Sequence, residues 1–425
     1  MMTGFKPDGN AAKDSLGHFA TAFVFLLSGL ATLLWNSSRI VEGQYADARV
    51  VGGLHWLTLG WLSISIFGAL RVFSGVALGS SAHHRWLSGV VWFCWSLGAV
   101  LFPVGLMMFL PKLIMGGITL IFIALVFFSI HFIPVLWKAS RGTLTRVYLC
   151  VALLSLWCVF WLGAGAGFLR AGWVAWPLPE GYFQAHLLVA LFGWVGSTVV
   201  GVGSHLIPMF ALSNNPKQWA VKSALPFWVC IPFCATIGAF YPNPFLWIGW
   251  SVAGIGSLLW GIQVYFYFDT KLRKEKDWGL FMAGGATVWL VVSWPILWFV
   301  ENIGHGSKIG VVGIFLVCWL TLFTLGIYHR VVPFLVWFQR FANKMGKEPV
   351  PRVKDMIHNR LAFLTTCFAL IGAVIWVCGL FGKNTTLAWI GSACILCAGL
   401  GALGQLRFLY QPLPAPVKGM GVSPK

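Results

Sequence analysis

Residues 185–211 read AHLLVALFGWVGSTVVGVGSHLIPMFA, a run that contains no Asp, Glu, Lys or Arg. A helix needs about 20 consecutive apolar residues to cross a bilayer, so this run is long enough to span one. It carries His186 near one end and His205 near the other. Because an imidazole in hydrocarbon needs polar partners, the run predicts a membrane helix that carries a functional site.

Similar apolar runs recur along the whole chain, which is 59% hydrophobic and only 9% charged. This composition excludes a soluble globular domain. We expect twelve spans, at residues 17–36, 51–70, 87–109, 113–137, 147–168, 185–211, 223–241, 245–268, 279–300, 309–337, 361–380 and 385–407. The predicted fold class is an all-α polytopic membrane helix bundle. It forms a single membrane domain over residues 1–425, with short tails at about 1–16 and 408–425.

The distribution of Lys and Arg predicts the orientation of the chain. Of the 29 residues of these two types, 23 fall on the side of the N-terminus and six on the other. The positive-inside rule then places both termini in the cytoplasm, in a protein of the bacterial inner membrane. The net charge of +18 fits contact with anionic lipid rather than with nucleic acid, so the lipid bilayer is the expected partner.

Acidic residues and cysteines narrow the choice of function. All eleven Asp and Glu residues fall in loops or at the ends of spans, whereas ion-coupled transporters generally carry a buried carboxylate. The ten cysteines lie within spans or at their edges, where we expect them to pack as small apolar residues. The histidines are therefore the main candidates for chemistry.

The histidines fall at two levels of the predicted bundle. Spans two, six and ten run inward, so His55, His186 and His305 are expected near the outer boundary, and His205 and His329 near the inner ends. His186 and His205 are 19 residues apart, which is about 28 Å along a helix and close to the hydrocarbon thickness. One histidine pair in each leaflet is therefore geometrically feasible. The weaker candidates, which match no motif, are His305, His131 and His18.

A transmembrane haem b requires two neutral imidazoles from different helices at one depth, and small residues where the flat ring meets a backbone. Ala190 and Gly193 lie on the helical face of His186 and offer such a surface. The alternative is that these small residues serve only close helix packing. A weak internal repeat, G-W-x6-G, joins Gly60-Trp61 to Gly193-Trp194 and indicates that spans two and six are related.

Three stretches resemble a known family. Residues 185–210 resemble the histidine-bearing helix of haem–copper oxidase subunit I, particularly of the cbb3 type. HWLTLGWLSISIFGALR, at 55–71, is similar to that subunit and to the NnrS family of haem- and copper-containing membrane proteins. GIYHRVVPFLVWFQRF, at 326–341, adds to the likeness, as do twelve spans with cytoplasmic termini. The resemblance implies an oxidase-subunit-I-like bundle in which His55 and His186 ligate haem.

The chain also departs from the family pattern. The oxidase helix carries H-x-H, whereas this chain reads Gln184-Ala185-His186, and the histidines that hold copper in span seven are missing from residues 223–241. The resemblance therefore does not imply an oxygen-reducing haem–copper centre. It does imply a redox partner such as a cytochrome c or a quinol, or other membrane subunits.

These observations lead to one main hypothesis. We expect one haem b at His55 and His186, and a second, inner site at His205 and His329, where Arg330 is a candidate to neutralise a haem propionate. The expected function is electron transfer or redox chemistry linked to O2 or NO, and the sequence leaves open whether the chain is itself an enzyme. Three alternatives remain: copper at the outer histidines, a transmembrane transporter, and an assembly or structural subunit without chemistry.

Overall fold

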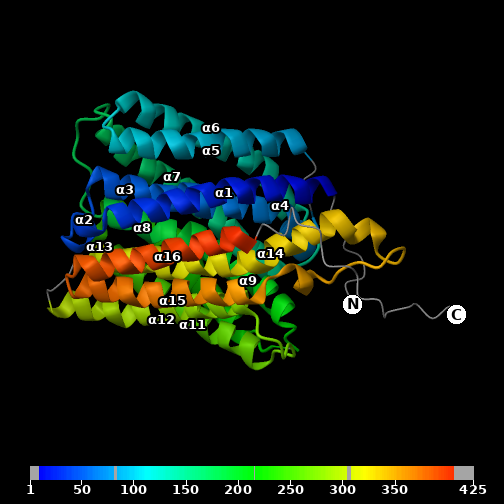
Figure 1. Cartoon of the computed structure of the whole chain (residues 1–425). Coiled ribbons are helices and arrows are strands. Elements are labelled where there is room, and N and C mark those ends of the chain that lie inside the picture. Colours follow the sequence, from blue (N-terminus) through cyan, green and yellow to red (C-terminus); the bar gives the residue numbers. More distant parts are fainter. Residues whose placement is uncertain (1–8, 81–83, 215, 304–307, 406–425) are drawn as a thin grey trace.

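Twelve long helices lie side by side and form one bundle in the computed structural model (Figure 1). The structure describes residues 9–80, 84–214, 216–303 and 308–405. Within these ranges the regular structure is helical, and all twelve long helices are apolar enough to cross a membrane. The prediction of an all-α integral membrane protein with twelve spans is confirmed.

The helices lie within a few residues of the predicted spans. In chain order the elements are α1 (Gly9–Trp35), α2 (Ser37–Val41), α3 (Ala48–His55), η1 (Trp56–Ser63), α4 (Ile64–Leu78), α5 (Arg85–Met107), α6 (Pro111–Trp137), α7 (Thr143–Arg170), α8 (Tyr182–Leu188), η2 (Val189–Gly196), α9 (Ser197–Ala211), α10 (Trp219–Phe240), α11 (Pro242–Asp269), α12 (Trp278–Ile303), α13 (Lys308–Ile314), η3 (Phe315–Thr321), α14 (Leu322–Phe341), η4 (Ala342–Lys344), η5 (Val353–Met356), α15 (Asn359–Phe381) and α16 (Thr385–Gln405).

The first helix begins earlier than the sequence predicted. Residues 9–16 were expected in a tail, but they form the first turns of α1. Asp14 pairs with Arg71 of α4 at 2.9 Å, and the Ser15 hydroxyl donates a hydrogen bond to the carbonyl of Gly68 at 2.7 Å. These two contacts give polar groups of α1 partners on a neighbouring helix. The predicted tail at 408–425 lies outside the described residues.

An even number of spans returns the chain to the end at which it started. The first residue of α1 and the last residue of α16 therefore lie at the same end of the bundle, and we call the opposite end the distal end (Figure 1). The α2–α3 loop, the C-terminus of α7 and the N-terminus of α8 lie at the distal end. Which end faces the cytoplasm stays a prediction.

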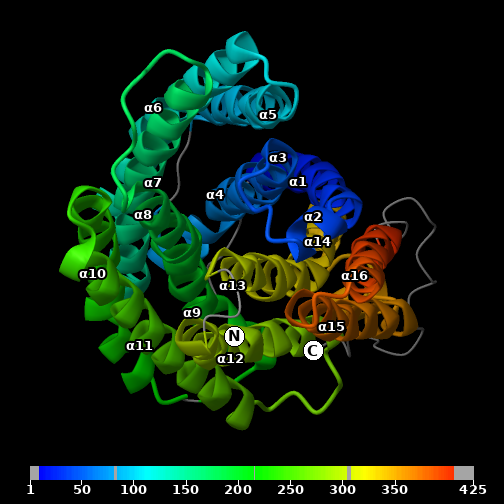
Figure 2. The same ribbon diagram turned by 90° about the vertical axis from the view of Figure 1, so that its left-hand side faces the viewer.

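Three spans form the centre of the bundle. The most apolar windows of spans two, six and ten are 78%, 78% and 83% buried, against 33–50% for the other nine. Viewed end-on, α4, α9 and α13 lie inside a periphery that includes α6, α10, α11 and α15 (Figure 2). We call spans two, six and ten the central spans. Because their side chains face protein rather than lipid, they are the spans that can hold an internal site.

Each central span contains a π-helical segment, namely η1, η2 or η3. Such segments widen a helix by one residue in a turn and are frequent at functional sites. Gly60-Trp61 and Gly193-Trp194 occupy the same place in η1 and η2, which agrees with the predicted relationship between spans two and six.

Aromatic rings pack across all three contacts between the central spans, including Phe67 and Trp194 of spans two and six, whose ring centroids lie 5.9 Å apart. Spans six and ten meet at Phe192 and Trp319, whose ring centroids lie 5.6 Å apart. Spans two and ten meet at Trp61 and Tyr328, at 4.7 Å. The third contact, between spans two and six, is the one that contains the outer histidine pair predicted from the sequence.

Candidate functional site

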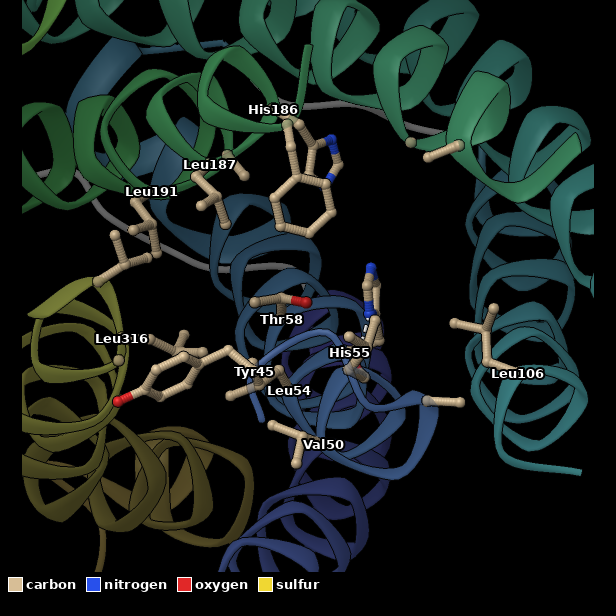
Figure 3. A pocket seen from close by; sticks show the side chains of 18 of the residues that line it. Tyr45, Val50, Leu54, His55, Thr58, Leu106, His186, Leu187, Leu191 and Leu316 are labelled. Carbon is tan, nitrogen blue, oxygen red and sulfur yellow. Dashed lines mark hydrogen bonds between the residues drawn. The ribbon is translucent and has the colours of Figure 1, made fainter. Parts of the chain in front are cut away.

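His55 and His186 face each other across the contact between spans two and six. His55 is the last residue of α3, directly before η1, and His186 lies in α8, directly before η2 begins at Val189. Their ring centroids are 6.5 Å apart and their ring planes differ by 28°. Figure 3 shows the two imidazoles pointing into one cavity from opposite sides. The sequence-based prediction that these two residues converge therefore agrees with the structure.

The separation of the two rings fits a single metal ion between them. A metal–imidazole bond is about 2.0 Å long and the ring nitrogen lies about 1.1 Å from the ring centre, so two imidazoles on one ion have centroids roughly 6 Å apart. The observed 6.5 Å is close to this value. A direct hydrogen bond between two ring nitrogens would bring the rings closer than that.

The hydrogen bonding of His55 leaves its second ring nitrogen with a free lone pair. Nδ1 of His55 donates to the carbonyl of Val51 at 2.8 Å, so the neutral ring keeps its lone pair on Nε2. Metal-binding histidines are typically oriented in this way by a backbone carbonyl. The carbonyl of Val159 lies near the His186 ring, but Nδ1 of His186 has no partner within hydrogen-bond geometry.

Two adjoining cavities surround the histidine pair. The larger has a volume of about 150 Å³ and reaches the distal end of the bundle, and the smaller has about 80 Å³ and lies deeper. Leu187 and Leu191 flank the space between the imidazoles on one side and Leu106 on the other (Figure 3). The residues that line both cavities are His55, Thr58, Phe102, Gly163, His186 and Ala190. The space around the pair is therefore mostly apolar.

Gly163 makes room for His186. A Cβ atom at this position would lie 3.1 Å from Cε1 of the His186 ring, which is tighter than ordinary side-chain contact. Gly163 belongs to the run Gly163-Ala164-Gly165-Ala166-Gly167 in α7, of which Ala166 and Gly167 also line the larger cavity. The sequence analysis missed this site element, although a run of alternating small residues in a span is a recognisable signal of close approach.

Two tryptophans close the deeper cavity, and their indole N–H groups already have acceptors. Nε1 of Trp194 donates to Oγ of Ser63 at 3.1 Å, and Nε1 of Trp95 donates to the carbonyl of Leu59 at 2.8 Å. The first bond joins η2 to η1, and the second joins α5 to η1. The deep end of the site is thus an aromatic wall whose polar groups are satisfied within the protein.

Gly193 does not line either cavity. A Cβ atom there would meet Ser155 of α7 at 2.7 Å, so this glycine allows η2 to approach α7 closely. Ala190, from the same predicted surface, does line both cavities. Gly193 therefore serves close packing of two helices, whereas Ala190 lines the predicted site.

The inner histidines contact different parts of the bundle. His329 is buried against Gly279 of α12, and both of its ring nitrogens lack hydrogen-bond partners. His205, half-buried in α9, lies within electrostatic range of Arg141 in the α6–α7 loop. No ring contact joins His205 to His329 in the described part of the chain, in contrast to the outer pair. An inner haem at these two residues stays a prediction.

Arg330 has an acidic partner within the protein. Its guanidinium pairs with the carboxylate of Asp277, which lies just before α12, and the two side chains are 11% and 8% exposed. Asp277 also accepts a hydrogen bond from the backbone N–H of Leu280 at 3.2 Å. From the sequence, Arg330 was a candidate to neutralise a haem propionate. The structure places it in a buried ion pair, and the role toward a propionate stays a prediction.

Two of the weaker candidates, His18 and His131, lie away from the outer pair. His18 and His131 line a separate cavity of about 20 Å³ together with Arg71. His305 falls outside the described residues, so its place relative to His55 is not defined by the structure. Among the described residues, no group of three or more His, Cys, Asp or Glu side chains is arranged to hold a metal ion.

Searches against protein-family models and against curated proteins found no match to this chain.

Proposed function

We propose that this protein is a membrane haem protein in which His55 and His186 ligate one haem b and that it serves electron transfer. The 6.5 Å separation of the two imidazole centroids, one from each of two central spans, carries this proposal. The orientation of His55 by the Val51 carbonyl supports it, because a metal-binding histidine needs a free lone pair on its second nitrogen.

The surroundings favour a macrocycle over a bare metal ion. Two imidazoles alone make a poor copper site, and the described residues offer no third His, Cys, Asp or Glu ligand. The pair is instead flanked by apolar side chains, including Phe102 and Leu106 of α5 and Leu191 of η2. Apolar walls on both sides of a histidine pair suit a flat ligand that is largely hydrocarbon.

When bound, haem supplies a one-electron couple, and the residues around it determine what that couple can do. His55 and His186 would hold the haem between them, and a haem held by two histidines would favour electron exchange over gas binding. Leu187, Leu191 and Leu106 exclude water from the space between the rings, and Val51 holds His55 in one tautomer. Burial of this kind also limits the reorganisation that a change of iron charge would cause.

A spectrum of the purified full-length chain tests the proposal directly. We expect a Soret band and a reducible α-band typical of low-spin haem b, with about one haem per chain by pyridine haemochrome assay. His55→Ala and His186→Ala should each lose most of the bound haem, whereas His84→Ala, which removes an exposed histidine that lines neither cavity, should retain it. A colourless wild-type protein without iron, produced with haem available, would overturn the proposal.

Carbon monoxide separates electron transfer from gas chemistry. With both axial positions occupied, the reduced wild-type protein should show no CO-induced spectral change. Residual haem in His55→Ala should bind CO, because that substitution opens one axial position. Strong CO binding by the wild type would instead indicate that only one imidazole is bound, and the function would move to O2- or NO-linked chemistry.

A further inference from the structure

The larger cavity is charged at one end only. Arg170, the last residue of α7, lines its distal rim, and it is the only Asp, Glu, Lys or Arg among the residues that line either cavity in the described chain. The deeper cavity ends at Trp95 and Trp194, whose N–H groups are bonded within the protein. A ligand of the whole site therefore meets a cation at the distal end and an apolar wall at the deep end.

Arg170 is hydrogen-bonded to a loop whose residues also line the cavity. Its Nη2 donates to the carbonyl of Ala46 at 3.3 Å, in the loop between α2 and α3. The preceding residue, Tyr45, also lines the cavity, and Figure 3 shows its side chain beside Leu316. Arg170 and Tyr45 thus both line the larger cavity, although they come from different elements.

Tyr45 can act as a hydrogen-bond donor in this cavity. Burial raises the pKa of the Tyr45 hydroxyl above its ordinary value, so this group keeps its proton at neutral pH. The hydroxyl lies close to Gly310, where a Cβ atom would be only 2.6 Å away. A guanidinium with its five N–H donors and a protonated phenol are both suited to bind carboxylate oxygens.

We infer that Arg170, with Tyr45, binds the carboxylate edge of the macrocycle and so orients it with its two acid groups toward the distal end. This inference rests on the proposed function, because it concerns the same site and ligand. Haem is amphipathic, with two propionates on one edge and apolar substituents on the other. The charge distribution of the cavities matches that asymmetry in one orientation only.

Masking the carboxylates of the ligand tests the inference. Full-length protein prepared without haem is titrated in detergent with haem b and with haem b dimethyl ester, whose carboxylates are uncharged. A charge-assisted hydrogen bond contributes about 1.5–3 kcal/mol, so wild-type protein should bind the diacid at least about tenfold more tightly than the ester. Arg170→Gln should lose most of this preference, and Arg170→Lys should keep part of it.

The matched control is Arg49→Gln. Arg49 is an exposed arginine in the first turn of α3, at the same end of the bundle, and it lines neither cavity. This variant should discriminate between diacid and ester as the wild type does. The midpoint potential gives a second readout: Arg170→Gln should lower it, because loss of a nearby positive charge favours ferric iron, and Arg49→Gln should change it less.

The outcomes distinguish the two proposals. If the wild type binds haem through His55 and His186 but Arg170→Gln leaves both the diacid preference and the midpoint potential unchanged, the orientation inferred here is wrong and the haem site stands. If the wild type binds neither haem nor its ester, the proposed function itself fails. Equal loss of diacid preference in Arg49→Gln would show a general surface-charge effect and would also overturn the inference.

Discussion

Trp194 and Ser63 join the two helices that carry the histidine pair. The indole Nε1 of Trp194, in η2, donates to Oγ of Ser63, in η1, across 3.1 Å. Ser63 in turn donates its hydroxyl proton to the carbonyl of Thr58 at 2.8 Å, so the bond belongs to a short chain within span two. Trp194 and Ser63 both line the deeper cavity, and their hydrogen bond joins spans two and six there.

Ser63→Ala should loosen that link. The substitution leaves the buried indole N–H of Trp194 without an acceptor, and we expect a loss of about 1 kcal/mol, the scale of interhelical hydrogen bonds in membranes. Thermal unfolding of the purified protein in detergent measures it. Ser96→Ala is a suitable control, because the Ser96 hydroxyl has no hydrogen-bond partner in the structure and its removal should be nearly neutral. Equal destabilisation by both variants would contradict this account.

Gly163→Leu should abolish ligand binding at the histidine pair. A Cβ atom at this position already lies 3.1 Å from Cε1 of His186, so a longer side chain must displace the imidazole or fill the cavity. We expect haem content to fall to that of His186→Ala while the protein still folds. Gly89→Leu is the control, since a Cβ at Gly89 meets nothing within 4 Å. Full haem content in Gly163→Leu would show that the ligand lies elsewhere.

Arg330→Gln should destabilise the fold without altering the haem spectrum. It leaves the carboxylate of Asp277 buried without its ion-pair partner, and breaking a buried pair costs about 3 kcal/mol. The control is Arg352→Gln, which removes an exposed partner of Asp355 and should cost less than about 1 kcal/mol. A shifted α-band in Arg330→Gln would instead support the original expectation that this arginine neutralises a propionate.

The pair of Glu275 and Lys354 should make stability depend on acidic pH. Nζ of Lys354 donates to Oε1 of Glu275 at 2.6 Å, and this hydrogen bond holds the pKa of Glu275 below its ordinary value. A carboxyl with a lowered pKa stabilises the folded state above its ordinary pKa and loses that contribution as the pH falls through the folded-state pKa. Glu275→Gln should therefore be less stable than the wild type at neutral pH.

The two proteins should approach each other as the pH falls below about 4.3, the ordinary pKa of a glutamate. Thermal unfolding of both proteins across this range, in one detergent and at one ionic strength, provides the measurement. A stability difference that stays constant with pH would mean that Glu275 acts through packing rather than through its charge.

Much of the fold follows from the sequence because a bilayer imposes a strict length and polarity on each span. The predicted spans differ from the observed helices by a few residues, except where α1 starts at Gly9 and α4 extends to Leu78. Within the first of these extensions Asp14 pairs with Arg71, a contact that joins two spans and has no local signature. Hydropathy is calculated for one segment at a time, so it does not predict a contact between two segments.

The candidate site was predictable in part. His55 and His186 could be matched because span order and direction place them at one level. Gly163 belongs to a run of small residues that signals close approach. Tyr45 and Arg170 carry no such signal, because their relation to the pair depends on which helices are neighbours. Gly193 shows the converse error: it lies on the same helical face as Ala190, but at its level that face meets α7 rather than the cavity.

The aromatic bridges at Phe192–Trp319 and Trp61–Tyr328 have a consequence for redesign. Each lies between two central spans, as the imidazoles do in the third contact, so the scaffold already contains two further places where paired side chains meet across widened helices. Replacing those aromatic residues with histidines would offer a route to a designed protein that carries several redox centres in one polypeptide.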